Sequence, residues 1–123
     1  MAISFEAPNP VLRIFDEAKA REFYIDWLGF SVDWEHRFEP GLPLYMQISR
    51  NGLLLHLSGH HGDGSPGIVI FQPMHGLAEF HAELTARGYH SLRPGIVAQD
   101  WGKEMTITDP FGNRIRFCER DAH

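Results

Sequence analysis

The sequence predicts one α+β domain, residues 1–123, built from two modules that each run strand, helix and three more strands (βαβββ). The first observation behind this prediction is that the same order of apolar patterns occurs twice, in about residues 8–58 and 67–120, around a linker at 59–66. The second is that paired Asn and Gly residues make a turn in each half, at 51–52 and 112–113. A duplicated module predicts two small, curved mixed sheets that lie side by side around a shared concavity.

The overall composition argues against several classes of protein. The formal net charge of -5 disfavours nucleic-acid binding, which needs a basic face, and permits a cationic ligand. No apolar run approaches the roughly 20 residues of a membrane helix, and the N-terminus lacks a basic-then-apolar signal pattern. The single cysteine, Cys118, cannot form an internal disulfide. We therefore expect a cytoplasmic protein with no nucleic-acid or membrane partner.

The first module begins with an apolar strand at residues 10–15. Asp16 follows as a candidate N-cap, because its side chain can accept from the free amides of the next turn. Helical spacing then defines one apolar face, and Gly29 ends the helix. The residues of that face are Ala20, Phe23, Tyr24, Trp27 and Leu28.

An alternating strand comes next. Phe30, Val32 and Trp34 fall on one face of this strand and Asp33 on the other, which predicts a half-buried strand with Trp34 beside the core. After a loop at 39–43, a second alternating run includes Leu44, Met46 and Ile48. The Asn51-Gly52 turn then leads into a returning strand at 53–57.

The second module follows a glycine-rich stretch at 60–67 that is too polar to be expected to pack. Residues 68–71 predict a strand, and Leu77, Phe80, His81 and Leu84 a helix capped by Gly88.

The last part of the chain predicts three strands. Residues 91–97 contain Pro94-Gly95 and predict a bent strand. Residues 104–108 and 114–118 form a closing hairpin around the turn at 109–113.

Two motifs resemble a known superfamily. Residues 20–30 match the pattern AxxFYxxxLGF, and residues 109–117 match DPxGNxIxF. Both are similar to signatures of the vicinal oxygen chelate (glyoxalase/bleomycin-resistance/dioxygenase) superfamily. The resemblance implies paired βαβββ modules, usually a homodimer, with ligand sites enclosed by the curved sheets. The fold alone does not give the function, because this superfamily includes metal enzymes and metal-free binding proteins.

The resemblance also indicates where a metal would bind. Enzymatic members hold a divalent ion with His, Glu or Gln at four places, which correspond here to positions near Asn9, near Gly67, at His56 and at Arg116. His56 is a weak candidate ligand, and a guanidinium cation at position 116 cannot coordinate a metal and would repel one. We therefore expect no metal, no cofactor and no catalytic residue.

A closer resemblance is to the bleomycin-resistance (ble-type) drug-binding proteins. Residues 29–34 are similar to their GFSxD-aromatic strand, and Trp101-Gly102-Lys103-Glu104 to their WGRE segment. Those proteins do no chemistry: they sequester a cationic, metal-loaded glycopeptide in grooves of a homodimer and so give resistance. Stacking and cation attraction suit aromatic rings in an acidic protein. The candidate ligand-binding residues are Asp33, Trp34, Phe38, Phe71, Trp101 and Gly102.

Each candidate has a plain structural alternative. Trp101 either faces a ligand or caps the dimer or the sheet edge. Core packing is the more frequent explanation for Trp34 and Phe38, and Phe71 depends on a local alignment. The role of Asp33 rests on the resemblance, since most such carboxylates are simply solvated.

Other residues suggest metal or thiol chemistry. His60-His61 with Asp63 could bind a transition ion, although adjacent histidines in a glycine-rich loop are more often surface residues. His56 is either a residual metal ligand or a core histidine paired with backbone, and the core histidine is the favoured interpretation. Cys118 has no basic partner beyond the arginines of its strand, so a nucleophile is not indicated.

Three functions are compatible with these observations. The leading hypothesis is a non-catalytic protein that sequesters bleomycin-type drugs. The rival is a metal-dependent lyase or thiol transferase of the same fold that uses His56 with unconventional ligands. The third is a binder of another aromatic or cationic metabolite.

Overall fold

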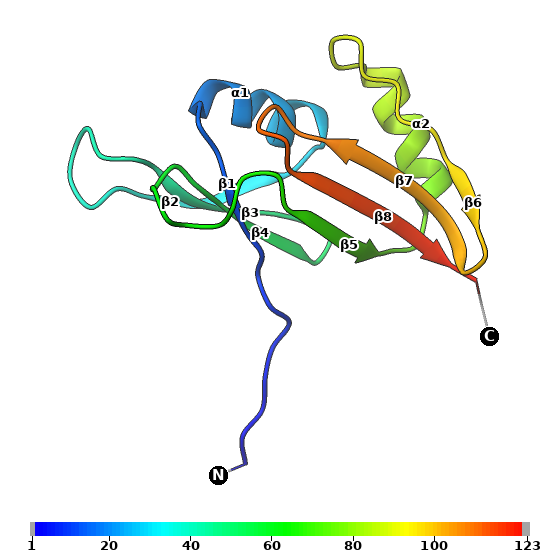
Figure 1. Ribbon diagram of the computed structural model, residues 1–123, viewed down its shortest axis with the longest axis horizontal. Coiled ribbons are helices and arrows are strands. Elements are labelled where there is room, and N and C mark those ends of the chain that lie inside the picture. The colour runs from blue at the N-terminus through cyan, green and yellow to red at the C-terminus, as the bar shows by residue number, and fades with distance from the viewer. Residues whose placement is uncertain (1, 122–123) are drawn as a thin grey trace.

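The computed structural model describes residues 2–121 and contains two four-stranded sheets with short helices (Figure 1). The first module consists of β1 (Val11–Arg13), α1 (Glu17–Arg21), η1 (Glu22–Trp27), β2 (Ser31–His36), β3 (Tyr45–Arg50) and β4 (Leu53–Ser58). The second consists of β5 (Val69–Pro73), α2 (Leu77–Arg87), β6 (Val97–Gln99), β7 (Gly102–Thr108) and β8 (Arg114–Arg120).

The two sheets repeat one topology. The strand order is β1-β4-β3-β2 in the first and β5-β8-β7-β6 in the second. In each sheet the module's first strand pairs in parallel with its last, and the other pairs are antiparallel. Figure 1 shows the helices on one side of the sheets and the N-terminal arm leaving on the other. The prediction of two βαβββ modules is confirmed.

The first helix begins as predicted and then widens. Asp16 caps it, accepting from the amide of Lys19 at 3.0 Å. From Glu22 the helix has π geometry, and the amide of Leu28 donates to the carbonyl of Phe23 at 3.0 Å, five residues back. This wider turn buries three large aromatic side chains on the core face.

Within residues 2–121 no helix combines the length and apolar character needed to cross a membrane.

The predicted turns and cap are confirmed. Asn51 and Gly52 both have positive φ, 46° and 94°, as a two-residue hairpin turn that follows strand twist requires. Gly88 ends α2 with φ of 71°, and its amide donates to the carbonyl of Leu84 at 2.9 Å.

The strand predicted at 91–97 is wrong in its position. The strand β6 begins only at Val97, and before it an isolated bridge joins Tyr89 and Leu92. Pro94 has no amide hydrogen and cannot donate to a sheet, so the regular pairing starts after it.

The segment at 60–67 packs, contrary to the prediction that it is too polar to do so. The buried Ser58 hydroxyl donates to Asp63 at 2.8 Å and accepts from the amide of His60 at 3.1 Å. Gly64 lies so close to β1 that an added Cβ would be 2.7 Å from the carbonyl oxygen of Val11. The loop therefore uses polar bonds, instead of apolar contacts, to pack against the first sheet.

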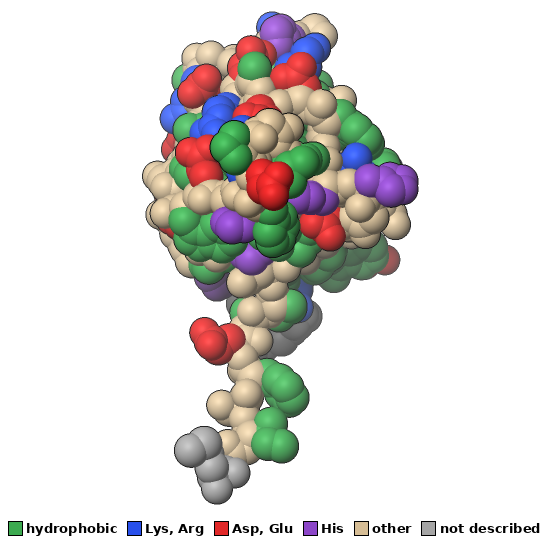
Figure 2. Space-filling view, turned by 90° about the vertical axis from the view of Figure 1, so that its left-hand side faces the viewer, with side chains coloured by type: hydrophobic (Ala, Val, Ile, Leu, Met, Phe, Trp, Pro, Cys, Tyr) green, Lys and Arg blue, Asp and Glu red, His purple; other side chains and the backbone are tan. Residues whose placement is uncertain are grey.

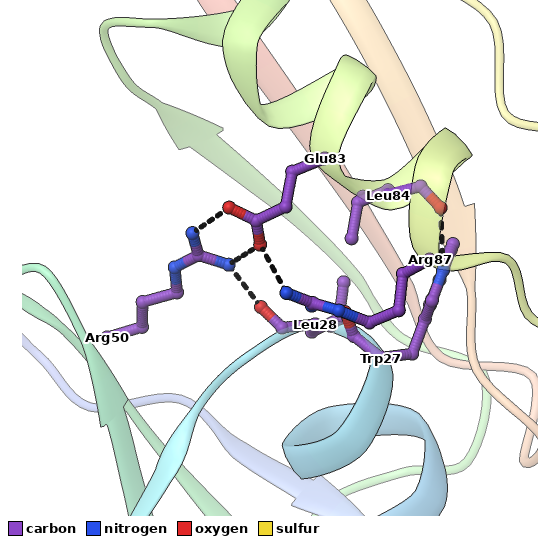
Figure 3. Close-up of polar contacts among 6 residues, drawn as sticks. All are labelled: Trp27, Leu28, Arg50, Glu83, Leu84 and Arg87. Carbon is purple, nitrogen blue, oxygen red and sulfur yellow. Dashed lines mark hydrogen bonds and ion pairs between the residues drawn. The ribbon is translucent and has the colours of Figure 1, made fainter.

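A set of ionic and backbone contacts joins the modules beside α2 (Figure 3). Glu83 accepts two hydrogen bonds from Arg50, at 2.7 and 2.8 Å, and forms an ion pair with Arg87 at 3.2 Å. Arg50 also donates to the carbonyl of Leu28 at 2.5 Å, and Arg87 donates to that of Trp27. These contacts tie β3 and the end of η1 to the second module's helix.

Candidate ligand-binding site

The first sheet has one face away from the helices, which we call the first open face. Alternation places the buried Met46 and Ile48 toward the core and Tyr45 and Gln47 on this open face. His56 lies opposite Gln47 in the register of β3 and β4 and shares the same face. Polar and aromatic side chains are thereby gathered on an accessible surface.

A β-bulge at Asp33 turns Trp34 toward this open face. Val32 pairs with Ile48, but Trp34 pairs with Gln47, so one residue of β2 is extra. Trp34 is 42% exposed. The prediction that it shares a face with Val32 beside the core is wrong, because the bulge interrupts the alternation.

Trp34 stacks on Tyr45 to form an aromatic platform. The ring planes differ by 9° and the centroids are 6.0 Å apart. His56 meets both rings edge-on, at 5.4 Å from Trp34 and 5.2 Å from Tyr45. An exposed platform of this kind can stack with a flat ligand.

A chain of hydrogen bonds runs from the platform residue Tyr45 to Asp33. The hydroxyl of Tyr45 contacts Nδ1 of His56 at 2.6 Å, and His56 Nε2 contacts Oε1 of Gln47 at 3.0 Å. Gln47 Nε2 donates to Asp33 at 3.0 Å, and the hydroxyl of Ser49 donates to the same carboxylate at 2.9 Å. Since the carboxylate is an acceptor, the consistent assignment puts the ring proton of His56 on Nε2 and makes Nδ1 the acceptor for Tyr45.

These bonds determine which atoms of His56 and Tyr45 donate and which accept hydrogen bonds. The favoured interpretation of His56 as a core histidine paired with backbone is wrong: both of its nitrogens bond to side chains. Burial raises the pKa of Tyr45, and the charge of Asp63 adds to this effect. Tyr45 is thus a hydrogen-bond donor to His56, not an acid that ionises near neutral pH.

Phe38 lies outside the strand, in the loop after β2, and is exposed. Its ring makes edge contacts with His36 at 4.7 Å and His60 at 5.6 Å. The core-packing alternative for Phe38 is therefore wrong. Figure 2, which views the molecule from this end, shows histidine and hydrophobic side chains mixed on the surface.

The second sheet has an equivalent surface, the second open face. Phe71 on β5 pairs with Arg116 on β8, which pairs with Thr106 on β7. Phe71 is 42% exposed. Its ring is therefore partly exposed to solvent in the middle of β5, which is an edge strand.

Trp101 and Gly102 lie at the hairpin between β6 and β7. Trp101 is 48% exposed, and its Nε1 donates to Glu104 at 2.7 Å. Gly102 is buried, and an added Cβ would lie 2.7 Å from the Cα of Arg120. Its lack of a side chain is required by strand packing, whereas Trp101 combines a position at the sheet edge with an accessible ring.

Sequence reasoning missed Tyr45, Gln47 and Glu104. Alternation with the apolar Met46 already places Tyr45 and Gln47 together, and that signal was usable. Glu104 is charged, so its residue type gives no signal for burial; its place opposite the buried Cys118 and its bond to Trp101 follow from the strand pairing of the folded chain.

The donor groups do not fit the metal site of the enzymatic relatives. Both ring nitrogens of His56 have partners, and Arg116 is a fixed cation. Asp63 of the loop histidine cluster is bonded to Ser58. Within residues 2–121, no group of three or more His, Cys, Asp or Glu residues is arranged to hold a metal ion.

Cys118 is fully buried on the second sheet, opposite Glu104. Burial raises the pKa of its thiol, and the nearby charge of Glu104 raises it further. The thiolate is the reactive form, so this environment is opposite to that of a nucleophilic cysteine.

A groove of about 1110 Å³ lies between the two modules. The N-terminal arm at 6–10, the turn between β3 and β4, and strand β5 line it, and Phe71 is one of its walls. The arm continues outward from this groove and exposes Ile3 (86%) and Phe5 (93%), as Figure 2 shows for its hydrophobic side chains.

Comparison with known proteins agrees with this architecture. A family model described as glyoxalase superfamily protein matches residues 1–123. A bleomycin-binding protein in complex with bleomycin is 25% identical, with a TM-score of 0.69 over 95% of this chain and 100% of that one.

Two further structures show the same fold. A bleomycin-binding protein of the bleomycin producer Streptomyces verticillus, in complex with copper(II)-bleomycin, is 20% identical, with a TM-score of 0.70 over 98% and 100% of the two chains. TnmS3, an antibiotic-binding protein from Streptomyces sp. CB03234, is 17% identical, with a TM-score of 0.71 over the same shares. No curated protein matches the sequence. Fold, motifs and family model together show that this chain belongs to the glyoxalase superfamily.

Proposed function

We propose that this protein is a non-catalytic binding protein that sequesters bleomycin-type glycopeptide antibiotics in the cytoplasm and so gives resistance. The observation that carries the proposal is the platform of Trp34 and Tyr45, whose stacked rings lie on an open sheet face. The likeness to the bleomycin-binding protein solved with bleomycin supports this choice of ligand.

The chemistry of the two open faces suits such a ligand. Stacking of aromatic pairs is worth about 0.5–1.5 kcal/mol beyond the buried area, and a flat heteroaromatic group can use Trp34, Phe71 or Trp101 in this way. Asp33 and the formal net charge of -5 attract a positively charged ligand. The proposed ligand-binding residues remain Asp33, Trp34, Phe38, Phe71, Trp101 and Gly102, with Gly102 contributing through close strand packing.

The proposed active form is a homodimer. Each open face is accessible on one side, so a large ligand needs a second surface to be enclosed. The exposed Ile3 and Phe5 on the arm offer apolar area for contact with a partner subunit.

Titration with copper(II)-bleomycin tests the proposal. Tryptophan fluorescence should be quenched at micromolar protein, and Trp34→Ala should weaken binding at least about tenfold, which corresponds to about 1.4 kcal/mol. Trp101→Ala should weaken binding as well. Phe15→Ala is the control and should bind normally, because this exposed aromatic lies in the segment between β1 and α1, beside Phe111 and apart from the Trp34–Tyr45 platform. The absence of quenching and of any heat of binding would reject the drug assignment.

Two alternatives give different outcomes. A binder of another flat or cationic metabolite would depend on Trp34 in the same way but would not bind bleomycin. The likeness to TnmS3, described as an antibiotic-binding protein, makes other antibiotics candidates for that ligand. A metal-dependent lyase or thiol transferase would require His56 to give up a bond to Tyr45 or Gln47. A stoichiometric divalent ion in protein purified without chelators would favour the enzyme.

A further inference from the structure

Glu104 is an unusual side chain on the second open face. Its side chain is only 8% exposed, and on the second open face it lies between the exposed Val97 and the buried Cys118. A carboxylate that is this little exposed normally has several hydrogen bonds. Its Oε1 is not among the fully buried polar atoms that lack a partner, so this oxygen can still be reached from solvent.

The bonds that Glu104 makes leave one oxygen without a donor. Oε2 accepts from Nε1 of Trp101 at 2.7 Å. Oε1 lies 4.0 Å from Nε of Arg116, which is beyond hydrogen-bond length. Within residues 2–121, no side chain donates a hydrogen bond to this oxygen. It faces the same side of the sheet as Arg116, because β7 and β8 place these residues diagonally on one face.

We infer that Glu104 and Trp101 form a subsite for a planar cation with N–H donors, such as an amidinium or a protonated amino-heterocycle. The inference rests on the proposed function, because it assigns a chemical class to a ligand group bound at the same open face. One N–H of the group donates to Oε1 of Glu104, and its flat face lies against the exposed ring of Trp101.

Arg116 has a defined part in this subsite. Its side chain is 41% exposed, and its guanidinium balances the charge of Glu104 from 4.0 Å without occupying the hydrogen-bonding position at Oε1. A cationic ligand group therefore meets both an attractive carboxylate and a repulsive guanidinium. Removing Arg116 should strengthen binding of a cation, whereas removing the charge of Glu104 should weaken it.

Benzamidine is a suitable probe, with benzamide as the neutral and benzoate as the anionic isostere. The indole N–H signals of the three tryptophans resolve the site in a ¹H–¹⁵N spectrum, and the signal missing from Trp101→Phe identifies Trp101. Benzamidine should shift the Trp101 signal to saturation. Benzamide should bind about tenfold more weakly or worse, and benzoate should leave the signal unchanged.

The variants give changes of opposite sign. Glu104→Gln keeps an oxygen for Trp101 and should lose at least about tenfold in benzamidine affinity. Arg116→Met should gain about threefold or more. The matched controls are Glu39→Gln in an exposed loop and Arg114→Met on the same strand, which change the net charge equally and should have much smaller effects. Thermal unfolding of each variant shows whether it is folded.

Equal shifts with benzamidine and benzamide, or weaker binding by Arg116→Met, would overturn the inference. Copper(II)-bleomycin is titrated into the same samples. If it binds and benzamidine does not, the subsite is wrong and the proposed function stands. If benzamidine binds as expected and bleomycin does not, the subsite stands and the drug assignment fails.

Discussion

Asp109 and Asn113 show why the closing turn has its particular residues. Asp109 is 5% exposed and accepts from the hydroxyl of Tyr24, from the side chain of Asn113 and from the amides of Phe111 and Asn113. Asn113 also donates to the carbonyl of Arg13 in the first module at 2.9 Å. The superfamily turn motif is therefore explained by a buried hydrogen-bond network that joins the two modules.

We expect Asp109→Ala to lower the free energy of unfolding by about 3 kcal/mol or more, because hydrogen bonds to a charged group contribute about 1.5–3 kcal/mol and several buried donors lose their acceptor together. Tyr24→Phe removes one of these bonds and should cost about half as much. Urea unfolding measures both. Asp100→Ala, in an exposed turn, is the control, and a loss for Asp109→Ala no larger than this control would contradict the network's importance.

Single residues also control the site. Trp101 covers Glu104 and bonds to it, so its removal affects both a buried carboxylate and an accessible ring. Among the described residues, Nε1 of Trp34 has no hydrogen-bond partner, and the ring of Trp34 stacks on Tyr45. Loss of Trp34 should therefore affect ligand binding more selectively than loss of Trp101.

At the scale of elements, α2 is held to the first module by charge. The hydrogen bonds from Arg50 lower the pKa of Glu83; burial opposes this, and the charges of Arg50 and Arg87 add to the lowering. Arg50 also lies over the ring of Phe80 at 4.9 Å, so two side chains on one face of α2, three residues apart, set its position. The ionic contacts of Figure 3 make the packing of α2 on the first module dependent on pH.

The sign of that dependence follows from the lowered pKa. A carboxylate with a depressed pKa in the folded state stabilises the fold above its unfolded pKa, near 4.5, and this contribution is lost as the pH falls through the folded value. Glu83→Gln should cost about 1 kcal/mol at pH 7, after allowance for its partial exposure, and almost nothing at pH 3.

Unfolding experiments at both pH values measure this difference. Glu79→Gln, one turn earlier on an exposed part of α2, is the matched control and should show no such change with pH. A deficit of Glu83→Gln that stays constant from pH 7 to pH 3 would mean that the charge of Glu83 does not hold the helix.

The elements also show what local patterns can predict. The turn at Asn51-Gly52, the caps at Asp16 and Gly88, and the order of strands and helices were predicted because each depends on nearby residues. The position of β6 was not, because pairing with β7 determines where a strand after Pro94 begins. The π geometry of η1 was not predicted either, and it accompanies the burial of Phe23, Tyr24 and Trp27.

At the scale of the whole molecule, the N-terminal arm leaves the sheets on the side away from the helices (Figure 1). The groove between the modules lies where this arm, β5 and residues of α2 meet. The arm carries the exposed apolar side chains Ile3 and Phe5, and the groove is lined in part by the rings of Phe30 and Phe117. In the proposed homodimer, apolar contact by this arm would remove Ile3 and Phe5 from water.

The double variant Ile3→Ser, Phe5→Ser tests this contact. If the arm holds the dimer, static light scattering should give a dimer mass for the unaltered protein and a larger monomer fraction for the variant, because burial of a large apolar side chain contributes about 1.5–3 kcal/mol. Leu42→Ser, an exposed apolar residue in a distant loop, should leave the mass unchanged. A monomer that still binds copper(II)-bleomycin tightly would contradict the interface site.

The sequence by itself determined the two-module fold, since turn chemistry and hydrophobic periodicity act over a few residues and were consistent throughout. Its resemblance to the superfamily also implies that Arg116, a cation, occupies a position where enzymatic members hold a metal ligand. Only the tertiary structure decided which face each candidate side chain occupies. A one-residue bulge at Asp33 moved Trp34 from the core side to the open face, and the turn fixed by the pairing of β6 with β7 brought Trp101 within hydrogen-bond distance of Glu104. Such outcomes depend on pairing between strands, which no single stretch of sequence contains.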